Sequence, residues 1–198
     1  METSNTNFTP QQSFDLINKI IDQNRMKYEE NGNNIFTWGI AVMFAGILQF
    51  ILIKIGQGEK SGLVWIFTMV PMFIYTFTAY FKKNKKVTEE SMAQDIPGYG
   101  WLMAGSMAMI TGFFFSNKFG AAFTTTMFLP FCVAALVSAI ALKKKLFVWL
   151  AVISSAVAYS ALFIPFMYHP LVTALIACLL FLIPGMILRS DYKKRQGV

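Results

Sequence analysis

Charged residues are scarce in this sequence. They make up 14% of its 198 residues, against roughly a quarter in ordinary soluble domains. The charges also gather in short runs that separate long apolar stretches, and no Asp, Glu, Arg, Lys or His lies in the middle of such a stretch. An ionisable group at the centre of a bilayer costs about 2.5–3.5 kcal/mol and usually marks an ion path. This pattern argues against a soluble domain, proton-coupled transport and carboxylate catalysis, but leaves a path for neutral solutes open.

Cysteine and histidine are also rare: the chain contains two Cys and one His. Cys132 and Cys178 fall inside apolar stretches, where they are expected to be small buried side chains. His169 lies in the predicted turn Tyr168-His169-Pro170 at the outer side of the bundle with no carboxylate or thiol nearby, so we expect an ordinary interfacial residue. Among the twelve Met, the pairs Met69/Met72 and Met103/Met107 have helical spacing, but no Cys or His lies near them in sequence, which favours packing over copper binding. We therefore predict no catalytic residue, no metal and no cofactor.

Apolar residues, at 56% of the chain, are abundant instead. They form six stretches close to the roughly 20 residues that cross a bilayer as a helix. The sequence predicts an all-α, polytopic membrane bundle of six transmembrane helices (35–55, 62–81, 99–116, 120–142, 146–167 and 171–188), with an N-terminal segment (1–34) and a basic tail (189–198).

The basic residues predict the orientation of this bundle. With the N-terminus in the cytoplasm, fourteen Lys and Arg fall on the cytoplasmic side and three (Lys54, Lys60 and Lys118) on the other. Since positive charge concentrates in cytoplasmic loops, both termini are predicted to be cytoplasmic, in contact with anionic lipids of that leaflet. The net charge of +7 then reflects topology, so we expect no direct contact with nucleic acid.

An amphipathic helix is predicted over residues 10–31, before the first span. Thr9 and Gln12 match a capping box at its start, and Gly32 suits its C-terminal cap. Its polar face carries four acidic and three basic residues, whereas lipid-binding helices usually have an excess of Lys and Arg. This favours packing on protein. The helix either covers its own bundle or mediates docking to a partner or self-association.

The third stretch contains small residues at every fourth position: Gly100, Ala104, Ala108 and Gly112. Such a stripe lets two membrane helices approach closely. We predict that this helix is central in the bundle and shielded from lipid.

Uncharged polar residues gather in the predicted outer half of the bundle. Gln49, Thr125 and Tyr159 form a candidate polar pocket open to the outside, in which Gln49 most needs a partner. The alternative is that such Ser and Thr side chains bond to their own helix or join neighbouring helices.

Trp and Pro recur in pairs that suggest three related hairpins. Trp38, Trp101 and Trp149 lie near the start of the odd spans, and Pro71, Pro130 and Pro184 lie within the even spans. Both residues are common at these places in membrane proteins, so an ancestral repeat and coincidence both stay open.

The segment from Tyr28 to Gly46 resembles the start of a group of small six-helix bacterial inner-membrane proteins with an N-terminal amphipathic helix. The matching residues are Asn31, Gly32, Trp38 and Gly39, and the resemblance covers about the first 55 residues. It implies a location in the bacterial cytoplasmic membrane and brings no activity.

Three classes of function stay open. The first is a non-enzymatic sensing, scaffolding or accessory membrane protein. The second is a small permease or exporter for an uncharged or amphiphilic solute. The third, an intramembrane enzyme, is disfavoured because no nucleophile, base and orienting group can be assembled from this sequence.

Overall fold

The computed structural model describes residues 9, 11–12, 14–15, 32–83 and 96–196. Every element in these ranges is helical, which confirms the all-α prediction. The long elements are α2 (Gly32–Lys54), α4 (Leu63–Lys83), α5 (Ile96–Phe114), α7 (Phe123–Ala141), α8 (Lys145–Ser160) and the continuous run of α9 (His169–Ala177), the π-helical turn η6 (Cys178–Leu182) and α10 (Ile183–Gln196). The short connectors are α3 (Gly58–Ser61), α6 (Ser116–Phe119) and the 3-10 turns η3 (Gly120–Ala122), η4 (Ala161–Phe163) and η5 (Phe166–Tyr168).

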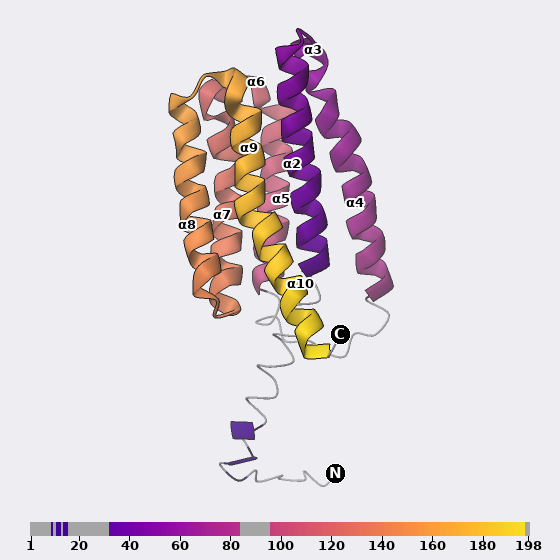
Figure 1. The fold of residues 1–198 in the computed structure, drawn as a ribbon, viewed down its shortest axis with the longest axis vertical. Helices are drawn as coiled ribbons and strands as arrows, with labels where there is room; N and C mark the ends of the chain where they lie inside the picture. Colours follow the sequence, from indigo (N-terminus) through magenta and orange to yellow (C-terminus); the bar gives the residue numbers. More distant parts are fainter. Residues whose placement is uncertain (1–8, 10, 13, 16–31, 84–95, 197–198) are drawn as a thin grey trace, which may run out of the picture.

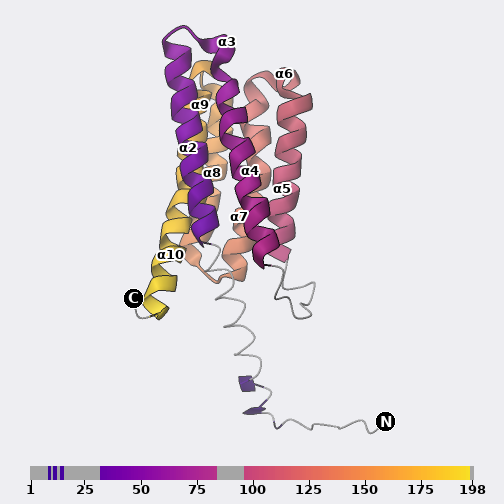
Figure 2. The ribbon, with the colours of Figure 1, turned by 90° about the vertical axis from the view of Figure 1, so that its right-hand side faces the viewer.

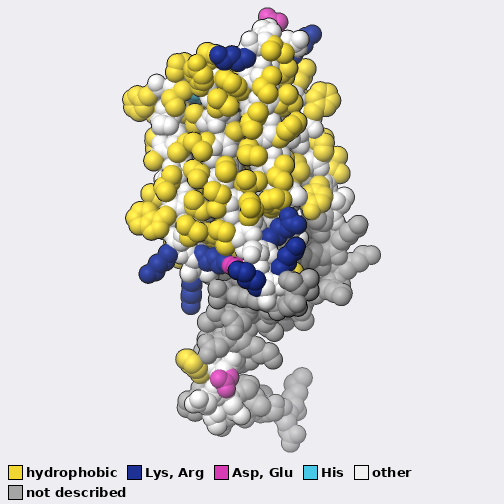
Figure 3. Space-filling model, viewed as in Figure 1, with side chains coloured by type: hydrophobic (Ala, Val, Ile, Leu, Met, Phe, Trp, Pro, Cys, Tyr) yellow, Lys and Arg dark blue, Asp and Glu magenta, His cyan; other side chains and the backbone are white. Residues whose placement is uncertain are grey.

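Five helical stretches are long and apolar enough to cross a membrane. They cover Gly32–Lys54, Gly58–Thr78, Gly120–Ala141, Lys145–Phe163 and Phe166–Lys194. The remaining long helix, α5, has 19 residues but is diluted by Gly, Ser and Thr, so the sixth span stays a prediction. Figure 3 shows hydrophobic side chains covering the visible face of the bundle between regions of Lys and Arg near its two ends.

The helices pair into three consecutive hairpins. These are α2 with α4, α5 with α7, and α8 with the α9–α10 run. Their connectors, α3, α6 and the η4–η5 segment, lie at one end of the bundle, here called the connector end (Figure 1). The opposite end carries the α7–α8 turn and the last turns of α10 and is called the basic end, after Lys143, Lys144, Lys145, Arg189, Lys193 and Lys194.

The α9–α10 run lies at the centre of the packing. It contacts α2 on one side and α8 on the other, while α4 packs on α2 and α5 packs on α7 (Figures 1 and 2). Ile176 and Ala177 in this run are fully buried, and Leu188 is nearly so. The most apolar span therefore supplies the largest share of the buried core.

Two helix boundaries differ from the prediction. The fifth span was expected to continue to residue 167, but α8 ends at Ser160 and the chain turns extended at Ile164 before Pro165. A residue before proline is disfavoured in the helical conformation, which explains the break. The basic tail also begins as helix, because α10 continues from the last span to Gln196.

The N-terminal capping box is present. The backbone N–H of Thr9 donates to Oε1 of Gln12 at 3.0 Å, and the N–H of Gln12 donates to Oγ1 of Thr9 at 3.3 Å. These are the two reciprocal bonds of the motif. Most of the predicted amphipathic helix (10–31) lies outside the described residues. Gly32, expected as its C-terminal cap, is instead the first residue of α2.

A hydrogen bond from a tryptophan indole joins the two helices in each of the first two hairpins. Nε1 of Trp38 donates to Oγ1 of Thr76 at 2.9 Å, and Nε1 of Trp101 donates to Oγ of Ser138 at 2.9 Å. Both hydroxyls donate in turn to the carbonyl four residues earlier in their own helix. Trp149 of the third hairpin is 65% exposed. The repeat of three hairpins stays a prediction, and this tryptophan–hydroxyl bond is present in two of the three hairpins.

Candidate functional site

The small-residue stripe of α5 faces α7. Ala104 and Ala108 are buried, and a Cβ added to Gly100 would lie 3.8 Å from Ala134. One added to Gly112 would lie 3.7 Å from Cε of Met127. The stripe therefore forms a helix interface with ordinary van der Waals spacing.

The position predicted for α5 is nevertheless wrong. Its opposite face is open, with Leu102, Met103 and Phe113 each between 64% and 70% exposed, so α5 is an edge helix in the single chain. Lipid chains are as apolar as buried side chains, so an apolar helix can lie at the edge of a bundle or in its centre. A stripe of small residues therefore shows that two helices pack closely, but not whether they are central or peripheral.

Glycines that leave no room for a side chain lie between α2 and the α9–α10 run, and this interface was not predicted from the sequence. A Cβ added to Gly39 would lie 2.7 Å from the backbone N of Leu182, and one added to Gly46 would lie 2.5 Å from the carbonyl oxygen of Pro170. An added Cβ on Gly185 would lie 2.7 Å from Cα of Phe36. The available signal was the seven-residue spacing of Gly32, Gly39 and Gly46, which places them on one face of α2.

The three residues of the predicted polar pocket lie on different helices, and two of them have their own partners. Oε1 of Gln49 accepts a bond from Nε1 of Trp65 at 2.7 Å, which links α2 to α4. Thr125, on α7, is buried and donates to the carbonyl oxygen of Ala158 on α8 at 2.6 Å. Tyr159, on α8, is 52% exposed. An open pocket shared by the three stays a prediction.

His169, predicted as an ordinary interfacial residue in a turn, is buried and bonds to two neighbouring segments. It is 4% exposed at the start of α9. Its Nδ1 lies 3.0 Å from Oγ1 of Thr124 and its Nε2 lies 3.1 Å from the carbonyl oxygen of Ile164. A carbonyl only accepts, so we assign the ring hydrogen to Nε2, and Nδ1 then accepts from the Thr124 hydroxyl. The ring joins α7, the break after α8 and the start of α9.

The sequence signal for this junction was weak but present. Pro165 and Pro170 bracket His169, and each restricts the backbone around it. Two prolines this close interrupt the helix and leave carbonyl groups without helical partners. A polar side chain between them is thus well placed to bond the carbonyl of Ile164.

In the described part of the chain, an ion pair and cation–aromatic contacts stabilise the basic end. Lys144, in the α7–α8 turn, pairs with Asp191 of α10. Nζ of Lys144 lies 5.4 Å from the centroid of the Phe147 ring, and the Arg189 guanidinium carbon lies 5.0 Å from that of Phe36. These contacts order the charged side chains at this end.

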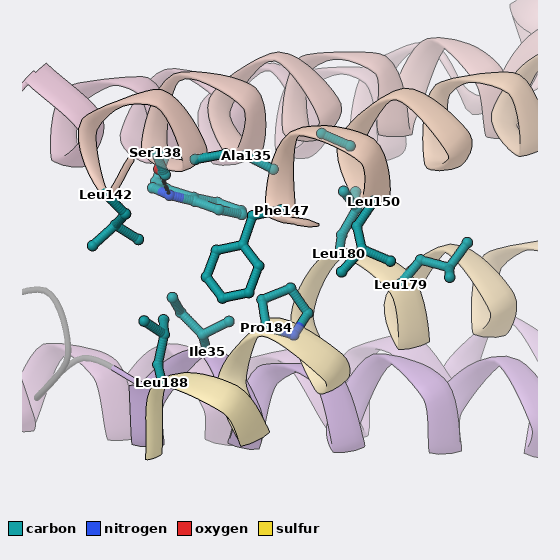
Figure 4. Close-up of a pocket in the computed structure, with 13 residues that line it drawn as sticks. Ile35, Ala135, Ser138, Leu142, Phe147, Leu150, Leu179, Leu180, Pro184 and Leu188 are labelled. Carbon is teal, nitrogen blue, oxygen red and sulfur yellow. Dashed lines mark hydrogen bonds between the residues drawn. The ribbon is translucent and has the colours of Figure 1, made fainter. Parts of the chain in front are cut away.

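An internal cavity of about 30 Å³ lies between the hairpins near the basic end (Figure 4). It is enclosed mainly by apolar side chains, among them Phe147, Leu180 and Pro184, with the Trp101–Ser138 pair as the polar feature of its wall. This volume matches the share of one water molecule in the liquid. The cavity is too small for a metabolite.

In the described ranges, no group of three or more His, Cys, Asp and Glu is arranged to hold a metal ion. Comparisons of this chain with protein-family models, curated proteins and solved structures find no match. The geometry of the bundle and the charge of its ends are therefore the features that bear on function.

Proposed function

We propose that this protein is a non-enzymatic membrane protein that senses or scaffolds, with six spans in a bacterial cytoplasmic membrane and both termini in the cytoplasm. The observation that carries the proposal is the backbone-to-backbone packing of α2 on the α9–α10 run at Gly39, Gly46 and Gly185. Helices packed this closely at the centre leave no path for a solute between them. Such a bundle is suited to hold its two ends in a fixed position relative to each other.

The charge distribution supports the orientation. The α7–α8 turn and the end of α10 contain seven Lys and Arg among the described residues (Lys143, Lys144, Lys145, Arg189, Lys193, Lys194 and Arg195). The connectors at the other end carry Lys60 and Lys118, and Lys54 ends α2. Positive charge is retained in the cytoplasm during insertion, so the basic end is the cytoplasmic one under this proposal.

Docking to a partner protein is assigned to the N-terminal segment. The described part of this segment begins with the capped turn at Thr9 and Gln12. Phe14, just after this turn, is 63% exposed. The balanced charge of residues 10–31 favours a protein surface over a lipid surface.

Site-specific photo-cross-linking in native membranes tests this proposal. A photoreactive phenylalanine at position 14 is expected to cross-link to a protein partner and give a discrete product. Deletion of residues 9–30 should abolish any cellular response that depends on this docking. The same group at Phe67, which is 77% exposed on α4, is the matched control and should give mainly lipid adducts. Two differently tagged copies distinguish self-association from another protein. If position 14 gave mainly lipid adducts, as position 67 is expected to do, docking to a protein would be refuted.

A small permease or exporter for an uncharged or amphiphilic solute is the second candidate. The observation that favours it is the Gln49–Trp65 bond, which places an amide within an apolar helix pair in the connector half. Gln49→Leu should then impair export and leave the position-14 cross-link unchanged. A normal solute flux in this variant would reject the permease and leave the scaffold standing.

A further inference from the structure

A shallow groove of about 310 Å³ opens at the basic end between the start of α2 and the middle of α10. It is lined by Phe36, Met186, Arg189, Ser190 and Lys193. Arg189, Ser190 and Lys193 are exposed, and Met186 is 54% exposed. The groove thus joins an apolar floor to a cationic and hydroxyl-bearing rim.

The rim is suited to a phosphate group. Arg189 and Lys193 are four residues apart on α10, so their side chains project from the same face of the helix one turn apart. The Arg189 guanidinium lies 5.0 Å from the Phe36 ring centroid, and this contact restricts its orientation. Guanidinium and ammonium groups both form strong charge-assisted bonds to phosphate oxygens. Asp191, on the same helix, has its charge balanced by Lys144.

The floor favours a lipid over a free phosphate. Arg189 follows immediately after the apolar Met186-Ile187-Leu188, at the boundary where headgroup phosphates lie if α10 ends a span. One turn beyond Phe36 on α2, Ile40 is 43% exposed, and Phe44 one turn further is 58% exposed. An acyl chain has an apolar path leading away from the rim, which inorganic phosphate would not use.

From this arrangement we infer that the groove binds the phosphate headgroup of an anionic phospholipid, with Arg189 and Lys193 as the headgroup ligands and Phe36 and Met186 against the start of an acyl chain. The inference rests on the proposed membrane location and orientation. It assigns a specific lipid site to the basic end, in addition to the general attraction of its charges to an acidic leaflet.

Native mass spectrometry of the full-length protein tests the site, with phosphatidylglycerol and phosphatidylcholine added in competition. The R189Q/K193Q variant is expected to lose about thirtyfold in preference for phosphatidylglycerol, since each of the two basic residues near an acidic surface contributes about 1 kcal/mol and each 1.4 kcal/mol is a factor of ten. The K143Q/K145Q variant removes the same charge from the exposed α7–α8 turn and should keep the preference. Equal losses in the two variants would overturn the site, because they would show surface charge alone.

Two further arms identify the ligand. Met186→Ser should weaken retention of phosphatidylglycerol because it makes the floor polar, and inorganic phosphate at the same concentration should not displace the lipid. Displacement by phosphate would overturn the lipid assignment. Thermal unfolding of each variant must match that of the parent protein for its result to be used.

The membrane location is measured separately by carbonate extraction of cells that express the parent protein. Release into the soluble fraction would refute the proposed function. A protein that stays in the membrane but shows no preference for phosphatidylglycerol over phosphatidylcholine would refute this inference alone.

Discussion

Two interfaces in this bundle contain small residues, and they differ in how closely their helices approach. Between α2 and the α9–α10 run, an added Cβ would lie 2.5–2.7 Å from backbone atoms at Gly46, Gly39 and Gly185. Between α5 and α7, the nearest atoms to an added Cβ on Gly100 are 3.8 Å away. The first interface requires glycine because no side-chain atom fits, while the second only has room for small side chains. The required glycines mark the centre of the bundle, and the stripe marks an edge helix.

The largest expected effect is that of Gly39→Leu. Its side chain would collide with the backbone of Leu182 and force α2 away from the central run, at a cost of about 3 kcal/mol or more. We expect little folded protein, measured as the monodisperse fraction in size-exclusion chromatography after extraction. Gly105→Leu is the control, because no atom lies within 4 Å of an added Cβ there. Equal recovery of the two variants would contradict the close approach.

Gly46→Ala tests the same interface with a single methyl group. The Cβ would lie 2.5 Å from the carbonyl oxygen of Pro170, so we expect a loss of about 1–3 kcal/mol. The loss should appear although alanine is intrinsically the better helix former by up to about 1 kcal/mol. Thermal unfolding in detergent measures it, with Gly105→Ala as the matched control. A melting temperature at or above that of the parent would show that α2 and α9 can separate freely.

Ala108→Leu tests the edge interface. Ala108 is buried against α7, but α5 is open on its other side and can move outward. We expect a smaller loss of about 1 kcal/mol, with normal insertion into the membrane. The melting temperature reports the loss, and protease accessibility of tagged termini reports insertion. An unchanged melting temperature would show that the stripe does not contribute to assembly.

Gly100→Ala has the smallest expected effect, and it has the opposite sign to that of Gly46→Ala. The new methyl group would make ordinary contacts with Ala134, so the helix preference of alanine should dominate and stabilise by up to about 1 kcal/mol. The same unfolding assay compares the two variants directly. Destabilisation as large as that of Gly46→Ala would make the two interfaces equivalent and remove the distinction.

The fold was more predictable from the sequence than the candidate sites were. The first span, predicted at residues 35–55, corresponds to α2 at Gly32–Lys54, because apolarity and length are local properties. The end of α8 was missed although Pro165 is visible in the sequence, since the apolar run continues across the break. The need of Gln49 for a partner was recognised, but not its partner Trp65, because a separation of 16 residues does not specify which side chains meet.

The apolar helices, their approximate lengths and the unequal charge of the bundle ends follow from the chain alone, because each depends on residues close together in sequence. The central position of the α9–α10 run, the peripheral position of α5 and the burial of His169 depend on which helix faces meet. Hydropathy does not distinguish these faces, since lipid chains and core side chains are equally apolar. Steric fit does distinguish them, and at Gly39 and Gly46 that fit allows no side chain at all.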